Sequence, residues 1–323
     1  MTDLKATLNA SGSTLAKPYL EEAAAAFNEK NKGVQINYAG GGSGKGRTDF
    51  SDQVTDFGAS DSPFKDEDKA KVKGGEFFYF PFVLAPITVS YNLDGVSKLQ
   101  LTPATIAKIF QRDVKVWNDP AIAADNPGVT LPATAITVAH RSDGSGTTQN
   151  FTEFLNKAVG GDGTWKLKSG STVEWPADTQ GAEGNSGVAK IVKDTKGGIG
   201  YVDYSDAKAN GLKFASVQNK AGKFVEATLA GASAAAAGAE IKADLTFSST
   251  WATGDAAYPI AAQAFLLVYK NQPDKAKGEA LKAFIQYALT DGQTLAAKVD
   301  YAALPKSVAD KAVAQLSSLQ IGG

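Results

Sequence analysis

Apolar and polar residues follow two different periods along the chain, and segments of the two kinds alternate. Runs with an apolar residue at every second position predict strands, and runs with apolar residues three and four positions apart predict helices. We expect strands at residues 4–9, 34–38, 77–91, 136–139, 198–204 and 259–269. We expect helices at residues 15–31, 66–72, 103–110, 187–193, 230–239, 274–289 and 305–319, and another from residue 151. Alternating strands and helices are typical of an α/β fold.

Three of the predicted strands run into turns of small polar residues, and a helical pattern follows each turn. The turns are residues 11–14, 40–47 and 141–147. Because the first N–H groups of a helix have no carbonyl partner within the helix, such a turn can bind an anion.

The third turn carries the most chemistry. Arg141 supplies a guanidinium, which suits oxyanions. Ser145 and Thr147 add hydroxyl groups, and Gly146 allows the backbone to approach a ligand closely. Asp143 would repel an anion, so we expect it to hold and partly neutralise the Arg141 side chain. An ordinary strand-to-helix turn with a serine cap is an equally simple interpretation.

The second turn contains a Gly-Lys pair at residues 44 and 45, as a nucleotide-binding P-loop does. That motif needs a glycine five residues before the pair and a serine or threonine after it, but Ala39 and Gly46 occupy these positions. We therefore expect no nucleotide site, while a merely flexible turn remains an alternative. Asp61 follows a run of small residues, which is also the pattern of a turn or cap residue.

Charge and composition argue against several classes of function. The 323 residues include 33 basic and 34 acidic side chains without a basic block, which argues against binding to nucleic acid or an anionic membrane. There is no cysteine and His140 is the only histidine, so a disulfide framework and a Cys/His zinc site are excluded. We expect no metal and no cofactor. The longest apolar runs are too short to span a bilayer.

The length favours two domains, because a single hydrophobic core rarely grows this large. The strand patterns near residues 86–91 and 259–269 resemble each other and indicate two connectors. We therefore expect residues 1–86 and 262–323 to form lobe 1, and residues 87–261 to form an inserted lobe 2. The chain starts without a basic and apolar leader, so we expect either a cytoplasmic protein or one whose export signal was removed.

Three motifs make the chain resemble the PstS family, the phosphate-binding proteins of bacterial phosphate ABC transporters. They are Ser-Gly-Ser-Thr at residues 11–14, Gly-Ser at 42–43 with Asp-Phe-Gly-Ala-Ser-Asp at 56–61, and Arg-Ser-Asp-Gly-Ser-Gly-Thr at 141–147. Weaker matches at residues 117–120, 198–202 and 300–305 extend the similarity over almost the whole chain. The resemblance implies a type II periplasmic-binding-protein fold, in which two hinge strands join two lobes and the ligand lies in the cleft.

The resemblance also implies which residues bind phosphate. The implied ligand-binding residues are Ser13, Thr14, Leu15, Ser43, Asp61, Arg141, Ser145, Gly146 and Thr147, with Asp143 supporting Arg141. Leu15 replaces the phenylalanine of many relatives, which is harmless if only its backbone N–H is used. Lys45 and Arg47 stand where the best-known members have smaller or neutral residues, so we expect this rim of the site to be more positive.

The implied function is high-affinity binding of inorganic phosphate and its delivery to the membrane permease of an ABC importer. The resemblance implies a monomer in the periplasm or at the cell surface. Asp61 fits this function, because a carboxylate can accept the proton that phosphate carries and that sulfate lacks.

Two alternatives stay open. A binder of another tetrahedral oxyanion or of a small phosphorylated solute would use similar turns. A phosphatase-like hydrolase is less favoured, because Ser145 lacks the flanking glycines of a nucleophile elbow and His140 is the only histidine. We therefore do not expect an enzyme.

Overall fold

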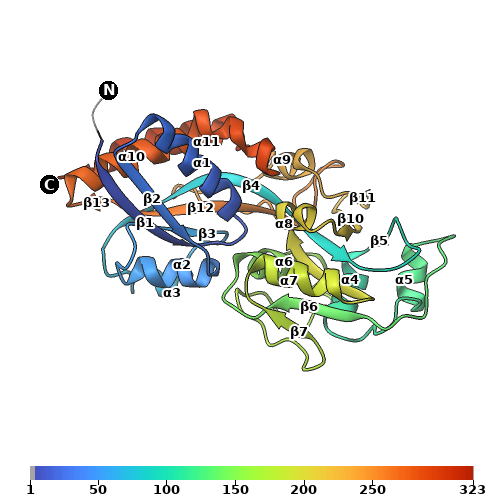
Figure 1. Cartoon of the computed structure of the whole chain (residues 1–323). Helices are drawn as coiled ribbons and strands as arrows, with labels where there is room; N and C mark the ends of the chain where they lie inside the picture. The colour runs from blue at the N-terminus through green and yellow to red at the C-terminus, as the bar shows by residue number, and fades with distance from the viewer. Residues whose placement is uncertain (1–3, 323) are drawn as a thin grey trace. The chain divides into compact units, whose positions relative to one another are not determined.

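The computed structural model of the chain describes residues 4–322, which divide into two units (Figure 1). Unit 1 consists of the chain up to Leu84, of Glu240–Ser248 and of the chain from Gln263 onward. Unit 2 consists of Ala85–Ala239 and Ser249–Ala262. Strands and helices alternate along the chain, so the protein is of the α/β class, as predicted.

The strands β4 (Phe77–Tyr91) and β12 (Ala261–Tyr269) each contribute residues to both units. Every residue of β12 is buried, and so is every residue of β4 from Tyr79 onward. Their sequences are almost continuously apolar, which is the pattern expected of strands that are covered on both faces.

The sheet of unit 1 brings three parallel strand ends to one edge. β1 (Ala6–Gly12) lies between β2 (Val34–Ala39) and β3 (Phe57–Ser60) and runs parallel to both. β12 continues the sheet antiparallel to β3. Because parallel strands end at the same edge, the chain leaves this edge into α1 (Lys17–Lys30) and α2 (Gly42–Ser51).

Helices cover both faces of the unit 1 sheet. α10 (Lys275–Leu289) and α11 (Lys306–Gln315) lie on one side, and α2 and α3 (Asp66–Lys69) lie on the other (Figure 1). Phe50 of α2 stacks on Tyr269 of β12 with 4.1 Å between ring centroids, which ties helix to sheet. The remaining elements are η1 (Asp291–Val299), η2 (Leu316–Ser318), β13 (Asn271–Gln272) and β14 (Gln320–Ile321).

In unit 2, β8 (Gly198–Asp203) pairs antiparallel with β4 and parallel with β6 (Thr137–Arg141), which in turn pairs with β7 (Gln180–Ala182). Phe151 stacks on Tyr201 of β8 at 4.5 Å between ring centroids. The helices are α4 (Pro103–Phe110), α5 (Pro120–Asp125), α6 (Gly146–Val159), α7 (Gly184–Asp194), α8 (Tyr204–Ala209) and α9 (Leu229–Ala237). The short strands are β5 (Gln100–Leu101), β9 (Lys213–Phe214), β10 (Ser216–Gln218) and β11 (Phe224–Val225).

The glycine-serine run at residues 40–47 is mostly helical, so the interpretation of this run as a flexible turn is wrong. Helix α2 begins at Gly42 and includes three glycines. A Cβ atom on Gly46 would lie 2.6 Å from both the Ala59 carbonyl oxygen and the Gly12 Cα atom. The absence of a side chain at Gly46 therefore allows α2 to pack directly against the backbone of β1 and β3.

The division of the chain also differs from the expected lobe boundaries. Glu240–Ser248 belongs to unit 1, although the prediction placed it in the inserted lobe. The segment contacts other parts of unit 1: Asp244 forms an ion pair with Lys69 at 3.8 Å, and Phe247 packs edge-on against Phe265 at 5.9 Å between centroids. The other boundaries fall after Leu84 and Ala262, and the helix predicted at residues 66–72 ends at residue 69.

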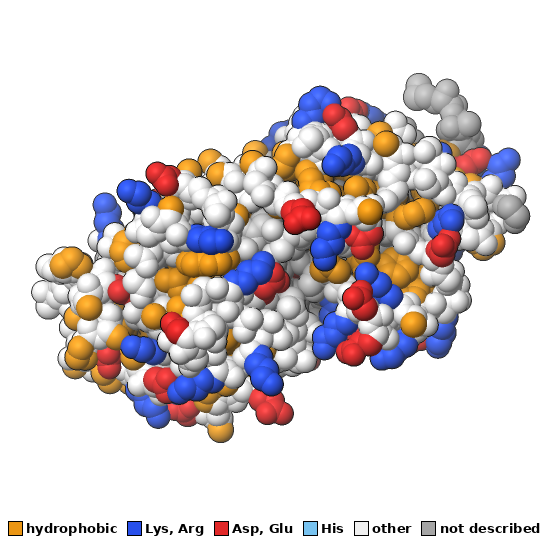
Figure 2. Space-filling view, turned by 180° about the vertical axis from the view of Figure 1, so that it is seen from behind, with side chains coloured by type: hydrophobic (Ala, Val, Ile, Leu, Met, Phe, Trp, Pro, Cys, Tyr) orange, Lys and Arg blue, Asp and Glu red, His pale blue; other side chains and the backbone are white. Residues whose placement is uncertain are grey.

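Acidic and basic side chains intermingle on the face shown in Figure 2, in line with the net charge of −1. Among residues 4–322, no helix has both the length and the apolar character that crossing a membrane requires. The same residues contain no cluster of three or more histidine, aspartate or glutamate side chains arranged for a metal ion.

Candidate anion-binding site

The first turn of unit 1 follows β1 and is shaped by Gly12. Its φ angle is 137°, and a Cβ atom there would lie 2.0 Å from the Ala59 carbonyl oxygen, so only glycine fits. The next residue, Ser13, is fully buried, and its Oγ accepts a hydrogen bond from the Ala16 N–H at 3.0 Å. The same hydroxyl donates to Oδ1 of Asp61. The only proton that the Ser13 hydroxyl can donate is therefore donated to Asp61 within unit 1.

Thr14 and Leu15 follow in this turn and lie in different surroundings. Thr14 is half-buried, whereas the Leu15 side chain is fully buried in the core. The Leu15 carbonyl accepts a hydrogen bond from the Tyr301 hydroxyl, and the Tyr38 hydroxyl donates to the Ser13 carbonyl at 2.7 Å. Two tyrosines therefore fix the backbone of this turn.

Ser43 lies in the first turn of α2 and is fully buried. Its Oγ donates to Oδ2 of Asp61 at 3.2 Å and accepts a hydrogen bond from the Asp61 N–H at 3.1 Å. The start of α2 and the end of β3 are therefore joined through one serine.

Asp61 is the meeting point of the unit 1 residues, and it is only 1% exposed. Its two carboxylate oxygens accept hydroxyl hydrogen bonds from Ser13 and Ser43, which matches an ionised carboxylate that can only accept. The Asp61 carbonyl accepts from the Gln263 amide at 3.2 Å. Burial raises the pKa of Tyr38 well above its usual value, and the nearby charge of Asp61 adds to this effect.

In unit 2, Arg141 ends β6, and its side chain is bound by Asp143. The Arg141 Nε donates to Oδ1 at 2.6 Å, and its Nη2 donates to Oδ2. The Gly184 N–H, at the start of α7, donates to Asp143 at 3.2 Å. Burial alone would raise the pKa of Asp143, but the hydrogen bonds and charge of Arg141 outweigh it, and the pKa lies below its usual value. Arg141 Nη1 makes no hydrogen bond to any residue between 4 and 322.

The third turn leads from β6 into α6. Ser145 is the N-cap of this helix, and its Oγ accepts a hydrogen bond from the Thr148 N–H at 3.0 Å. The serine-cap interpretation of this turn is thus confirmed for the Ser145 side chain. Thr147 is fully buried, and its hydroxyl accepts a hydrogen bond from the Asn185 amide at 3.1 Å. The Gly146 and Thr147 N–H groups lie in the first turn of α6, where a helix offers no carbonyl partner.

Hydrogen bonds link several of the predicted site residues within each unit, namely Ser13, Ser43 and Asp61 in unit 1 and Arg141 and Asp143 in unit 2. The structure also shows hydrogen-bond partners of these residues that the sequence analysis did not name. The residues that it adds are Tyr38 and Gln263 in unit 1, and Asn185 and Tyr201 in unit 2. Tyr201 accepts a hydrogen bond from the Arg141 N–H at 3.0 Å and lies within the match at residues 198–202. Arg47, which the sequence analysis named on the rim of the site, stands one helical turn after Ser43 and donates hydrogen bonds to Ser60 and Ser62.

His140 is not arranged as a general base for Ser145. Its Nδ1 lies 2.9 Å from the Arg141 carbonyl oxygen, and its ring stacks on Trp175 with 5.1 Å between centroids. The hydroxyl of Ser145 accepts from a backbone N–H instead. The arrangement within unit 2 therefore supports anion binding rather than nucleophilic catalysis.

Comparison with known proteins gives consistent matches. A family model described as a PBP superfamily domain matches residues 2–292. The phosphate-binding protein PstS of Pasteurella multocida is 37% identical over 321 residues, covering 98% of this chain and 91% of the relative. The phosphate-binding protein PstS of Haemophilus influenzae is 39% identical over 290 residues, covering 88% of this chain and 85% of the relative.

Two solved structures with phosphate bound share the two-unit α/β fold of this chain, which is the predicted periplasmic-binding-protein fold. A high-affinity periplasmic phosphate-binding protein, PfluDING, has a TM-score of 0.81 at 19% identity, covering 98% of this chain and 96% of that one. A putative phosphate ABC transporter substrate-binding protein from Clostridium perfringens has a TM-score of 0.70 at 20% identity, covering 93% of this chain and 100% of that one.

Proposed function

The chain belongs to the PBP superfamily and, within it, to the PstS family of phosphate-binding proteins, and on this premise we propose that it binds inorganic phosphate for an ABC importer. The observation that carries the proposal is the buried Arg141, which is held by Asp143 at the end of β6 and next to the start of α6. A guanidinium and helix N–H groups together suit a small oxyanion. The protein acts by binding and release, and no bond is made or broken.

Each unit offers its own set of phosphate-binding groups. In unit 1 these are the backbone of residues 14 and 15, the Ser43 hydroxyl and the Asp61 carboxylate, while Ser13 holds that carboxylate. In unit 2 they are the Arg141 guanidinium and residues 145–147. We propose that both sets contribute to phosphate binding.

The proposed location is the periplasm or the cell surface, and the proposed partner is the membrane permease of a phosphate ABC importer. Relatives and structural neighbours carry names that refer to phosphate binding, to the periplasm and to ABC transport, which supports both proposals. Monomeric action is part of the same proposal.

Calorimetric titration tests the function directly. Protein stripped of ligand by unfolding and refolding is titrated with phosphate, arsenate and sulfate. Phosphate should also raise the melting temperature, because a hundredfold excess over Kd adds about 2.7 kcal/mol to the stability of the native state. A protein that shows neither heat nor a melting shift with millimolar phosphate would refute the proposal, and equal binding of sulfate would favour a general tetrahedral-anion binder.

Asp61→Asn tests the proposed selectivity. The wild-type carboxylate only accepts hydrogen bonds, so a ligand without an O–H is expected to bind roughly 10⁴-fold more weakly than phosphate. Asparagine can also donate, so the variant should gain sulfate affinity by a larger factor than it loses phosphate affinity. Arsenate should compete with phosphate in both proteins, because it keeps the proton and the shape. An unchanged phosphate-to-sulfate ratio in the variant would show that Asp61 does not set selectivity.

A further inference from the structure

Helix α2 holds the turn at residues 60–62 with two side chains. Ser43 and Arg47 are four positions apart, so they project from the same side of the helix. Ser43 binds the middle residue of the turn, Asp61, through both its backbone N–H and its carboxylate. Arg47 binds the two serines on either side.

The contacts of Arg47 lock this turn. Its Nη1 donates to the Ser60 hydroxyl at 2.9 Å and to the Ser62 hydroxyl at 3.0 Å, and lies 3.5 Å from the Ser62 carbonyl oxygen. The Ser60 hydroxyl in turn donates to the Ser62 carbonyl at 2.6 Å and accepts from its N–H at 3.3 Å. Both serines are buried, so the hydrogen bonds are shielded from water.

Asp61 and its two neighbours are held by different groups. Asp61 reaches the hydroxyls of Ser13 and Ser43, whereas its neighbours on both sides are held by Arg47. The carboxylate is therefore fixed by its own partners and, through the backbone, by the arginine.

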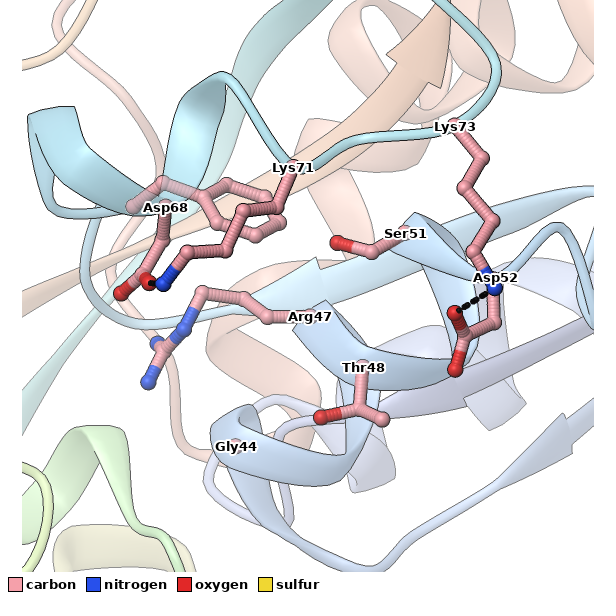
Figure 3. Close-up of a pocket in the computed structure, with 9 residues that line it drawn as sticks. Gly44, Arg47, Thr48, Ser51, Asp52, Asp68, Lys71 and Lys73 are labelled. Atoms are coloured by element: carbon pink, nitrogen blue, oxygen red, sulfur yellow. Dashed lines mark hydrogen bonds and ion pairs between the residues drawn. The ribbon is translucent and has the colours of Figure 1, made fainter.

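Among the described residues, Arg47 forms no ion pair with a carboxylate. It lines a cavity of about 480 Å³ in unit 1, together with Lys71 and Lys73 (Figure 3). Both lysines are paired, Lys71 with Asp68 and Lys73 with Asp52, each at 2.7 Å. Within residues 4–322, no carboxylate lies at ion-pair distance from Arg47, whose hydrogen bonds all go to the serines of the turn.

The charge of Arg47 acts on Asp61. Burial lowers the pKa of the Arg47 guanidinium, and the charge of Asp61 is the largest influence that opposes this shift. An arginine stays protonated in either case. A half-buried guanidinium that has no ion-pair partner loses favourable hydration free energy. If the side chain at position 47 only had to fill space, an uncharged residue would stabilise the protein more.

We propose that Arg47 is a positioning residue for the selectivity of the anion site: it makes the turn at residues 60–62 rigid, so that Asp61 presents a fixed acceptor to the ligand. This inference rests on the proposed function. A fixed carboxylate rejects a ligand that has no O–H, because the lone pairs of two oxygens then face each other in a dry site. A loosened turn lets the carboxylate rotate away, which relieves that repulsion and allows sulfate to bind.

The experiment compares phosphate and sulfate affinities by calorimetry in phosphate-free buffer. Arg47→Met keeps the length of the side chain and removes its charge and its donors, while Arg47→Lys keeps the charge. Lys73→Met is the matched control in the same cavity, because Lys73 is 66% exposed and pairs with Asp52 at 2.7 Å. Melting temperatures are recorded for each variant.

We expect Arg47→Met to lower the phosphate-to-sulfate ratio of affinities about tenfold, which corresponds to 1.4 kcal/mol of discrimination. Arg47→Lys should restore part of the ratio, and Lys73→Met should leave it unchanged. A purely structural arginine would weaken both anions equally, so a ratio that falls by less than fivefold in Arg47→Met overturns the inference. The same holds if Lys73→Met lowers the ratio as much as Arg47→Met.

Two further results keep the outcomes distinct. A wild-type protein that binds no phosphate overturns the proposed function itself. If Arg47→Met does not fold, the double variant Ser60→Ala/Ser62→Ala removes both anchoring hydroxyls while it keeps the arginine, and it is judged by the same fivefold limit.

Discussion

Removal of the Arg141 guanidinium should destabilise unit 2 through the carboxylate that it leaves behind. The Arg141 side chain is 1% exposed, and the Asp143 side chain is 14% exposed. Arg141→Ala would leave Asp143 with the Gly184 N–H at 3.2 Å and without a countercharge. The loss of one partner of a buried ion pair costs about 3–5 kcal/mol. Because Asp143 keeps one hydrogen bond and some exposure, we expect a loss near the lower end, about 3 kcal/mol.

The double variant Arg141→Ala/Asp143→Ala separates the stability effect from phosphate binding. Without the carboxylate no charge is left unpaired, so the double variant should recover at least half of the lost stability. Phosphate affinity should stay low in both variants. A lost charge-assisted contact costs about 2–5 kcal/mol, which is roughly a 30-fold to several thousandfold loss of affinity.

Urea denaturation followed by tryptophan fluorescence is the appropriate assay, because all four tryptophans lie in unit 2. Calorimetry on the same samples gives the phosphate affinity. A double variant that is no more stable than Arg141→Ala would contradict the unpaired-charge argument. A loss of phosphate affinity below tenfold in Arg141→Ala would show that the guanidinium does not bind the ligand.

Two other predictions concern stability. Gly46→Ala places a Cβ atom 2.6 Å from backbone atoms of Gly12 and Ala59, so it should lower the free energy of unfolding by about 1–3 kcal/mol. Gly161→Ala serves as the control, because a Cβ atom there has open space. Equal melting temperatures for the two variants would refute the close-packing argument. Burial lowers the pKa of His140, so the folded protein favours the neutral ring. The stability that follows from this is fully present above pH 6.5, the usual pKa of histidine, and it is lost as the pH falls toward the lowered pKa. His140→Phe keeps a ring against Trp175 and should therefore lose less stability than the wild type between pH 7 and pH 5, which unfolding curves at the two pH values can check.

The sequence alone determined the features that depend on local patterns. Strand and helix periods located most elements, for example the helix that follows Thr102-Pro103 and the long buried strand at residues 77–91. The small polar turns before helices, together with the order of three motifs, pointed to the family and to Asp61 and Arg141 as candidate residues. These features can be predicted because hydrophobic period, capping and turn chemistry act over a few neighbouring residues.

The tertiary structure decided whatever depends on residues that are distant in the sequence. Local propensity disfavours a helix with three glycines, at about 1 kcal/mol for each glycine, but α2 forms because Gly46 lets it approach the backbone of β1 and β3. The same docking aligns Ser43 and Arg47 with the turn at residues 60–62. Gln263 reaches the turn at residues 60–62 from β12, 202 residues away in the sequence, and Tyr38 reaches the backbone of Ser13 from β2. No local pattern encodes such partners, because their contacts exist only once the sheet has brought its strand ends together.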